Sequence, residues 1–598
     1  MHQGVAHPGT RRATGVGPLS RGWVWALATL TYAVAAVALT YPGVLSFSHA
    51  ALGLPGDLYQ NLWNVLWVRG WLTGHHALYF TPLEYYPTGA NLAWETLSLP
   101  GTVVAALLSR PIGLAAAYNS VLLAYWVADG LALYVFARTV GLPRVSAWLA
   151  GLAFMASPYF VGQMMGHLHL VGAFGVPLFL SVLWKLYERP RVSVGRYLVL
   201  AGLLALTTYV VQDYAVYAIA VAVLLLFLHP ARPWRRVLAE WWRWIVAIVA
   251  YAAMVAPMAY AMLFGPLAVH AGAVTPVSTP WVVNLEGLVQ PEPWGLFVGL
   301  AARWRLAPDL LDGGFFPGFV LWAAVVVLLL TKRRLDPRYR RLARLAAIAT
   351  GLFAVLSLGP VLHVGDVTTA IPLPERVLAA LPVWQDTWPV RLAMLTALFG
   401  AILVGVAAHA VRTRWEDGEA EGAERARGRR IVVVAGVLLI AAASWSATFR
   451  ATAVPAVPYA RVVREAGGTV LYVPPMLPNT RMGYGSAEYI YVEAVLNRPT
   501  PEGYVSRIPL STVRRLNASP VLAYLWGLQF RHNHAAPLAG AASSGLSPYL
   551  KRYHVHSVVF LAQGVARPAH AVAWLRHHLG RAWQMRRYGT TRVFTRQS

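Results

Sequence analysis

Long apolar runs separated by short polar loops dominate the first three quarters of the chain. A helix needs roughly 20 mostly apolar residues to cross the hydrocarbon core of a bilayer. Eleven runs predict such helices, at 23–44, 115–138, 145–163, 170–187, 197–212, 214–229, 243–264, 316–331, 343–362, 389–411 and 431–448. The pattern therefore predicts an all-α polytopic membrane protein with about 11 transmembrane helices.

Basic residues gather in every second loop, as in 185–196, 232–243 and 332–344. Short Lys/Arg-rich loops stay in the cytoplasm, so residues 1–22 form a cytoplasmic tail and 23–449 the transmembrane domain. Basic and non-basic loops alternate along the whole chain only if residues 97–113 do not cross the membrane. Proline and glycine interrupt this segment, which suits a position at the membrane interface. We expect a cytoplasmic (inner) membrane protein whose first outer loop, 45–114, holds interfacial helices.

No apolar run follows residue 450. Segments 468–474 and 555–561 predict buried strands, and 511–528 and 568–579 predict helices, which indicates a small α/β domain over 450–598. The topology places this domain outside the cytoplasm. Its 18 Lys and Arg against 4 Glu would attract anionic membrane lipids.

Composition supports this class and excludes others. The mean hydropathy is +0.51, and 12% of residues are charged. Without cysteine, the chain has no thiol catalysis, disulfides or Cys-ligated metals. Its net charge of +26 is spread over loops between spans, so we expect no nucleic-acid partner. Phosphate-loop, G-x-S-x-G and H-E-x-x-H motifs are missing from the sequence, which argues against ATP-driven transport and against serine or zinc hydrolysis.

A polar stripe after the first span is the strongest chemical signal. At helical spacing, one face carries Asp57, Gln60, Asn61 and Asn64, and the other carries Leu58, Leu62, Val65 and Leu66. Such a helix lies in the membrane interface with its apolar side in lipid. Asp57 is then a candidate general base or metal ligand, with Gln60 and Asn61 as substrate ligands. An Asp after Gly also suits a helix N-cap, which does not exclude catalysis.

Two carboxylates and two histidines extend this candidate site. Glu84 and Glu95 share the first outer loop with Asp57. His167 and His169 have no third metal ligand nearby in sequence, which leaves contact with an anionic substrate or ordinary packing.

Two further charged residues border predicted spans. Asp213 lies between two spans, as a functional acid or a residue of a hydrated turn. Arg391 lies at the outer end of 389–411, where it either extends towards water or binds phosphate through its planar fork.

Several segments resemble the GT-C superfamily of integral-membrane glycosyltransferases. They include GDLYQNLWNVLW and YYPTGANL in the first outer loop, PVWQDTWPVRLAML before the span at 389–411, and RPTPEGYVSR in the C-terminal domain. The pattern is similar to bacterial members, including the YfhO-type branch, over nearly the whole chain. In that superfamily an acidic residue of the first outer loop is catalytic, and Asp57 is the position that matches. The chain lacks a D-x-D pair there, which leaves open whether a divalent cation (Mg²⁺ or Mn²⁺) takes part.

The resemblance implies transfer of a sugar from a polyprenyl-phosphate donor to an extracytoplasmic glycan, lipid or protein acceptor. Three alternatives stay open: a transporter or flippase of lipid-linked sugars, a glycan ligase or polymerase, and a non-catalytic scaffold. Transporters often carry paired repeats with broken helices, and no such repeat is evident in the sequence.

Overall fold

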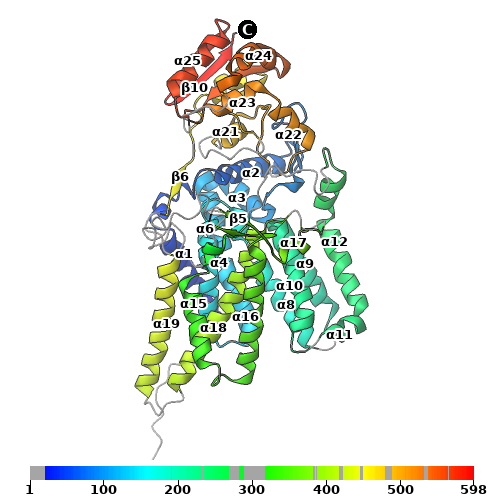
Figure 1. Ribbon diagram of the computed structural model, residues 1–598, viewed down its shortest axis with the longest axis vertical. Coiled ribbons are helices and arrows are strands. Elements are labelled where there is room, and N and C mark those ends of the chain that lie inside the picture. The colour runs from blue at the N-terminus through cyan, green and yellow to red at the C-terminus, as the bar shows by residue number, and fades with distance from the viewer. Residues whose placement is uncertain are drawn as a thin grey trace, which may run out of the picture.

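The computed structural model of the 598-residue chain describes residues 21–597 except 190–191, 232, 269–281, 289–316, 366, 382–383, 385–386, 417–421, 445–448, 478–487, 506, 531–535 and 563–564. Along its longest axis the molecule has three parts: a helical bundle, a thin middle layer that contains α2, and a C-terminal domain (Figure 1).

Long and short helices, most of them apolar, form the bundle. They are α1 (Arg21–Leu39), α4 (Leu114–Thr139), α5 (Arg144–Met155), α6 (Pro158–Gln163), α7 (Leu168–Val171), α8 (Gly175–Glu188), α9 (Val194–Val210), α10 (Gln212–Leu228), α11 (Trp234–Ala239), α12 (Trp241–Phe264), α15 (Phe319–Thr331), α16 (Pro337–Ser357), α18 (Ala393–Glu416) and α19 (Gly422–Ser444). Helix α18 packs against α5, α15 and α16 and is almost fully buried at their centre.

Six helical segments in the described part are long and apolar enough to cross a membrane: Gly22–Leu39, Leu114–Thr139, Arg144–Gln163, Leu168–Glu188, Trp241–Phe264 and Pro389–Thr413. Five other apolar helices are shorter. The chain is thus a multi-pass membrane protein, whereas the count of eleven spans stays a prediction. Helix α3 (Leu99–Ile112) has 14 residues. At about 1.5 Å per residue it is too short for a core of about 30 Å, in agreement with an interfacial 97–113 segment.

The middle layer is built on the first outer loop. It contains β1 (Ala50–Leu52), α2 (Asp57–Leu72), the β2–β3 pair (Phe80–Thr81, Ala90–Asn91) and α3. Helix α2 packs against α3 and α4 on one side and against α21 (Glu488–Leu496) on another. Leu58, Leu62 and Val65 are fully buried, and so is the polar Asn64. The prediction that the apolar face of α2 lies in lipid is therefore wrong, because protein covers that face.

The C-terminal part holds a four-stranded sheet in the order β7-β8-β10-β9 (Thr469–Val473, Val555–Phe560, Thr591–Arg596, Trp583–Tyr588). The β7–β8 pair is parallel, and the other two pairs are antiparallel. Strands β7 and β8 occupy the two segments predicted as strands. The helices of this part are α20 (Ala460–Ala466), α21, α22 (Leu510–Asn517), α23 (Pro520–Gly527), α24 (Ala539–Arg552) and α25 (Pro568–Leu579).

Two connections fix the C-terminal part to the first outer loop. Strand β6 (Ala451–Ala453) pairs antiparallel with β1, although about 400 residues separate them. Residues 499–505, which we call the strap, run beside residues 83–86: Thr500 N donates to Leu83 O (2.6 Å), and Tyr85 N donates to Glu502 O (2.9 Å). These backbone bonds hold part of the C-terminal domain directly above α2.

Candidate active site

Asp57 is the first residue of α2, and Gly56 is the N-cap. The chain turns into the helix at Gly56 with φ of 122°, a conformation that favours glycine. The alternative of Asp57 as the N-cap is therefore wrong. Its side chain instead receives two contacts: His167 Nε2 lies 3.0 Å from Oδ2, and the Tyr504 hydroxyl donates to Oδ1. The carboxylate keeps 29% exposure, so a substrate can reach it.

The backbone brings His167 to Asp57. Leu54 N donates to Met165 O (2.7 Å), just before α2 begins. The amide of Asn61 donates to Gly166 O (2.7 Å) and to the backbone oxygen of Asp57 (2.8 Å). Asn61 is thus committed to holding the 165–167 segment against α2, and its predicted role as a substrate ligand stays a prediction.

The electrostatics of the site keep Asp57 ionised. Burial alone would raise the pKa of this carboxyl. The hydrogen bond and positive charge of His167, the hydroxyl of Tyr504 and the nearby His169 together lower the pKa of Asp57 to about 2. A carboxylate with this pKa is charged over the whole physiological range.

Arg391 and Asp213 form an ion pair beside the N-terminal ends of two bundle helices, α18 and α10. Arg391 Nη1 lies 2.6 Å from Asp213 Oδ2, and both side chains are less than 20% exposed. The guanidinium also lies 5.0 Å from the centre of the Trp388 ring. Two alternatives from the sequence are therefore wrong: Arg391 does not extend into open water, and Asp213 does not lie in a hydrated turn. Asp386, which precedes Arg391 in the sequence, lies outside the described residues.

His169 interacts with both Asp57 and Arg391. It lies close enough to Asp57 and Arg391 to interact with both charges, and its ring centre is 6.1 Å from that of His167. The side chain is 3% exposed, and neither ring nitrogen has a hydrogen-bond partner within the described part of the chain. A buried imidazole without protein partners is available to a ligand.

The side chains of the remaining predicted site residues form hydrogen bonds to groups other than Asp57. Gln60 Nε2 donates to Glu95 Oε1 (2.7 Å), so these two buried side chains satisfy each other. Glu84 accepts a hydrogen bond from the backbone N–H of Tyr504 (3.0 Å). Both glutamates therefore contribute to the framework around the site, and their direct contact with substrate stays a prediction.

Tyr504 is the residue that sequence analysis did not single out. It belongs to the RPTPEGYVSR segment that carries part of the GT-C resemblance, but 447 positions separate it from Asp57. A Cβ at Gly503 would lie 2.6 Å from the Tyr85 ring and 2.9 Å from Glu84 Oε2. Only glycine lets the strap approach closely enough to place Tyr504 on Asp57.

Three glutamates are buried in this region: Glu502 of the strap itself, Glu84 and Glu493. Burial raises the pKa of Glu502 to about 8 and the pKa values of Glu84 and Glu493 well above the ordinary range, with mutual repulsion adding to the latter two. Glu493 and Glu502, each with a pKa of about 8, are therefore largely protonated at neutral pH, which lowers the cost of burying them together.

A metal site is not assembled in the described part of the chain, where no group of three or more His, Asp or Glu side chains could hold an ion. Both oxygens of Asp57, the predicted metal ligand, already contact His167 or Tyr504.

No family model matches the chain, and no curated protein matches its sequence. Among solved structures, it is similar to the arabinofuranosyltransferase AftD from mycobacteria, with a TM-score of 0.58 and 16% identity over 97% of this chain and 40% of that one. ArnT from Cupriavidus metallidurans gives a TM-score of 0.48 with 13% identity over 96% and 98% of the two chains. The oligosaccharyltransferase AglB from Archaeoglobus fulgidus gives 0.47 with 13% identity over 90% and 69%.

The chain thus has a fold similar to that of AftD, and at the level of the fold this agrees with the predicted resemblance to the GT-C superfamily. The chain spans about 40% of the length of AftD. The YfhO-type branch stays a prediction.

Proposed function

We propose that this protein is a glycosyltransferase that moves a sugar from a polyprenyl-phosphate donor to an extracytoplasmic glycan, lipid or protein acceptor. The observation that carries the proposal is the ionised Asp57, held between His167 and Tyr504 on the same side of the bundle as Arg391 and His169. This arrangement offers an anionic proton acceptor and a cationic group for a phosphate within one site.

The reaction needs both groups. As the bond from the sugar carbon to the phosphate oxygen breaks, the electron pair leaves with the phosphate and the carbon becomes positive. The acceptor hydroxyl then bonds to that carbon and gives its proton to Asp57. A carboxylate with a pKa of about 2 is a weak base. The proton therefore moves only after the developing C–O bond has made the hydroxyl acidic.

Arg391 and His169 suit the donor end of the reaction. Arg391 is held by Asp213 through one nitrogen, which leaves other N–H groups of the planar fork for a phosphate. The unpartnered imidazole of His169 can donate to the same phosphate or to the sugar. Stabilising the leaving phosphate in this way lowers the barrier to bond cleavage.

The lipid tail of the donor explains why the site lies above a membrane bundle. We propose that the N-terminus is cytoplasmic and that the active site and residues 450–598 lie outside the inner membrane. A soluble nucleotide-sugar has no route to such a site.

A donor assay tests the proposal. The purified protein should transfer sugar from polyprenyl-phosphate-linked donors and not from nucleotide-sugars in the absence of polyprenyl lipid. Efficient direct use of a nucleotide-sugar would contradict the proposed donor. Movement of intact lipid-linked sugar across vesicles, without new glycosidic bonds, would favour the alternative of a flippase.

We expect Tyr504→Phe to reduce the turnover number by about 10–150-fold, because a hydrogen bond to a charged group contributes about 1.5–3 kcal/mol. The hydroxyl stabilises the ionised form of Asp57, so its loss should also raise the pKa of that carboxyl and move the acid limb of the pH–rate profile upward. The measurement is the pH dependence of the turnover number. Tyr588→Phe on β9 is the matched control and should leave the profile unchanged. A Tyr504→Phe enzyme with a wild-type profile would remove Tyr504 from the active site.

A further inference from the structure

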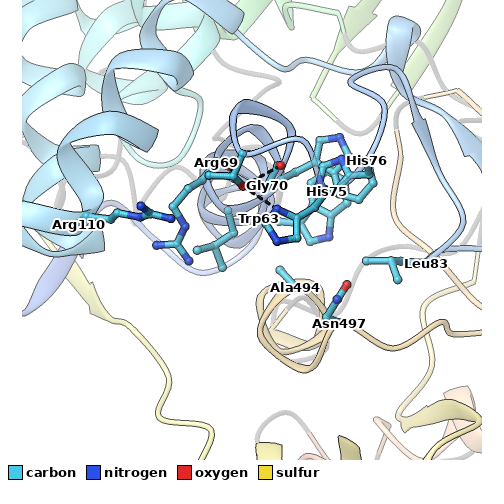
Figure 2. Close-up of a pocket in the computed structure, with 12 residues that line it drawn as sticks. Trp63, Arg69, Gly70, His75, His76, Leu83, Arg110, Ala494 and Asn497 are labelled. Carbon is cyan, nitrogen blue, oxygen red and sulfur yellow. Dashed lines mark hydrogen bonds between the residues drawn. The ribbon is translucent and has the colours of Figure 1, made fainter.

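A cavity lies at the opposite end of α2 from Asp57. It has a volume of about 300 Å³ and is formed by the C-terminal half of α2, the turn after it, the last turn of α3, and Ala494 and Asn497 at the end of α21 (Figure 2). A stack of rings forms part of its wall. The ring centres of Trp63 and Trp67 are 5.1 Å apart, and those of Trp67 and His76 are 3.5 Å apart. The cavity thus combines a rigid aromatic wall with a polar rim.

Two arginines line this cavity, Arg69 from α2 and Arg110 from α3. In Figure 2 both side chains extend to the same side of the cavity. Within the described part of the chain, no carboxylate forms an ion pair with either guanidinium. Each arginine lies in the last turn of its helix, where the helix dipole stabilises one exposed cation by up to about 1 kcal/mol. That effect explains a cation at each helix end but not the convergence of two on one cavity.

The convergence of two guanidinium groups fits an oxyanion. Their N–H groups match the oxygens of a phosphate or a carboxylate, and a bound anion would relieve the repulsion between the two positive charges. The cavity also offers hydrogen-bonding groups for the neutral hydroxyls of a sugar, because the exposed side chains of Asn497 and His75 line it.

The distance from Asp57 separates this cavity from the donor phosphate. Arg69 lies twelve residues after Asp57 on the same helix, or about 18 Å along its axis at 1.5 Å per residue. In the proposed function, the leaving phosphate of the donor is bonded to the reacting sugar carbon and must lie within a few ångströms of the site of Asp57. An anion in the cavity therefore belongs to another molecule or to a distant part of the acceptor.

The surface beside the cavity favours an acceptor at the membrane interface. Helix α3, which carries Arg110, exposes Val104, Leu107 and Ile112 by 45–62%. Exposed aliphatic side chains on an interfacial helix favour contact with lipid. We propose that Arg69 and Arg110 bind a phosphate or carboxylate group of the acceptor, while its reacting hydroxyl extends along α2 to Asp57. This inference rests on the proposed function for the identity of the ligand as the acceptor.

The experiment measures binding without turnover. The protein is placed in phosphatidylcholine nanodiscs, and saturation-transfer NMR compares glucose 6-phosphate with glucose. We expect signal from the phosphorylated sugar only, and about tenfold weaker binding in the double variant Arg69→Gln/Arg110→Gln, as for the loss of charged hydrogen bonds. Arg586→Gln, an exposed arginine on β9, is the matched control and should bind like the wild type.

Two further measurements are needed. One identifies the source of the anion, and the other tests the cavity site separately from the proposed glycosyltransferase function. If phosphatidylglycerol in the nanodisc displaces the sugar phosphate, the group belongs to a lipid-anchored acceptor; if it does not, the acceptor is an acidic glycan. Asp57→Asn should abolish transfer and keep this binding, so failure of the proposed function leaves the cavity site testable. Equal binding by the wild type and the double variant, or loss of binding in Asp57→Asn, would overturn the inference.

Discussion

Replacing Asp57 by asparagine is expected to lower the rate of sugar transfer by about 10²–10⁴-fold, the usual effect of losing a general base. Asparagine has nearly the same size and still offers one oxygen to His167 or Tyr504, so α2 should stay folded. The charge that accepts the proton is lost. The measurement is the turnover number with a saturating polyprenyl-phosphate-linked donor, alongside the melting temperature of the purified protein.

Asp336→Asn is the matched control. Asp336 caps α16 by accepting a hydrogen bond from Arg338 N (2.8 Å), so this variant also removes a carboxylate at a helix start. It should keep normal turnover. A folded Asp57→Asn enzyme with near-normal turnover would shift the search for the base to Glu95 or Asp213.

The pH dependence gives an independent check on Asp57. The pKa of its carboxyl is lowered to about 2, so stability and charge that depend on it are present above the ordinary pKa near 4 and are lost only as the pH falls towards about 2. We expect no loss of wild-type turnover through Asp57 between about pH 5 and 8. A turnover loss in that range that disappears in Asp57→Glu would contradict the assigned pKa.

Replacing Arg391 by alanine is expected to weaken donor use by about 10–150-fold, which corresponds to the 1.5–3 kcal/mol typical of a hydrogen bond to a charged group. Arg391→Lys keeps the charge but loses the planar fork, so its effect should be smaller and still measurable. The measurement is KM and kcat/KM for the lipid donor at fixed acceptor.

The ion pair with Asp213 requires a control for folding. Arg391→Ala leaves Asp213 buried without its partner, which typically costs about 3–5 kcal/mol. In Asp213→Asn the guanidinium stays in place, so donor KM should change far less than in Arg391→Ala. The double variant Arg391→Gln/Asp213→Asn removes both charges and should recover stability without donor use. If it also recovers donor use, Arg391 has only a structural role.

Much of the architecture could be predicted from the sequence because it depends on local patterns. Apolar runs of sufficient length predict membrane helices whatever surrounds them, and the predicted runs overlap every helix of the bundle except α11. The strands at 469–473 and 555–560 follow from short β-branched runs. The stripe at 57–64 pointed to Asp57, because four polar residues at helical spacing stand out in a region that is otherwise mostly apolar.

The surroundings of that stripe were decided by packing. Helical periodicity indicates that α2 has an apolar face but not what covers it, and protein rather than lipid covers Leu58 and Leu62. The same limit applies to Gln60 and Glu95, which appeared as two separate ligands and are one hydrogen-bonded pair.

Only the tertiary structure decided the partners of the charged groups. Tyr504 reaches Asp57 across 447 positions, and Arg391 reaches Asp213 across 178. No local pattern encodes such pairs: the strap paired with residues 83–86 brings Tyr504 to Asp57, and the packing of the bundle brings Arg391 to Asp213. The sequence by itself therefore determined that this is a membrane-helix protein with a carboxylate at Asp57. The folded chain determined that the C-terminal domain completes the site, since only long-range backbone pairing places its tyrosine there.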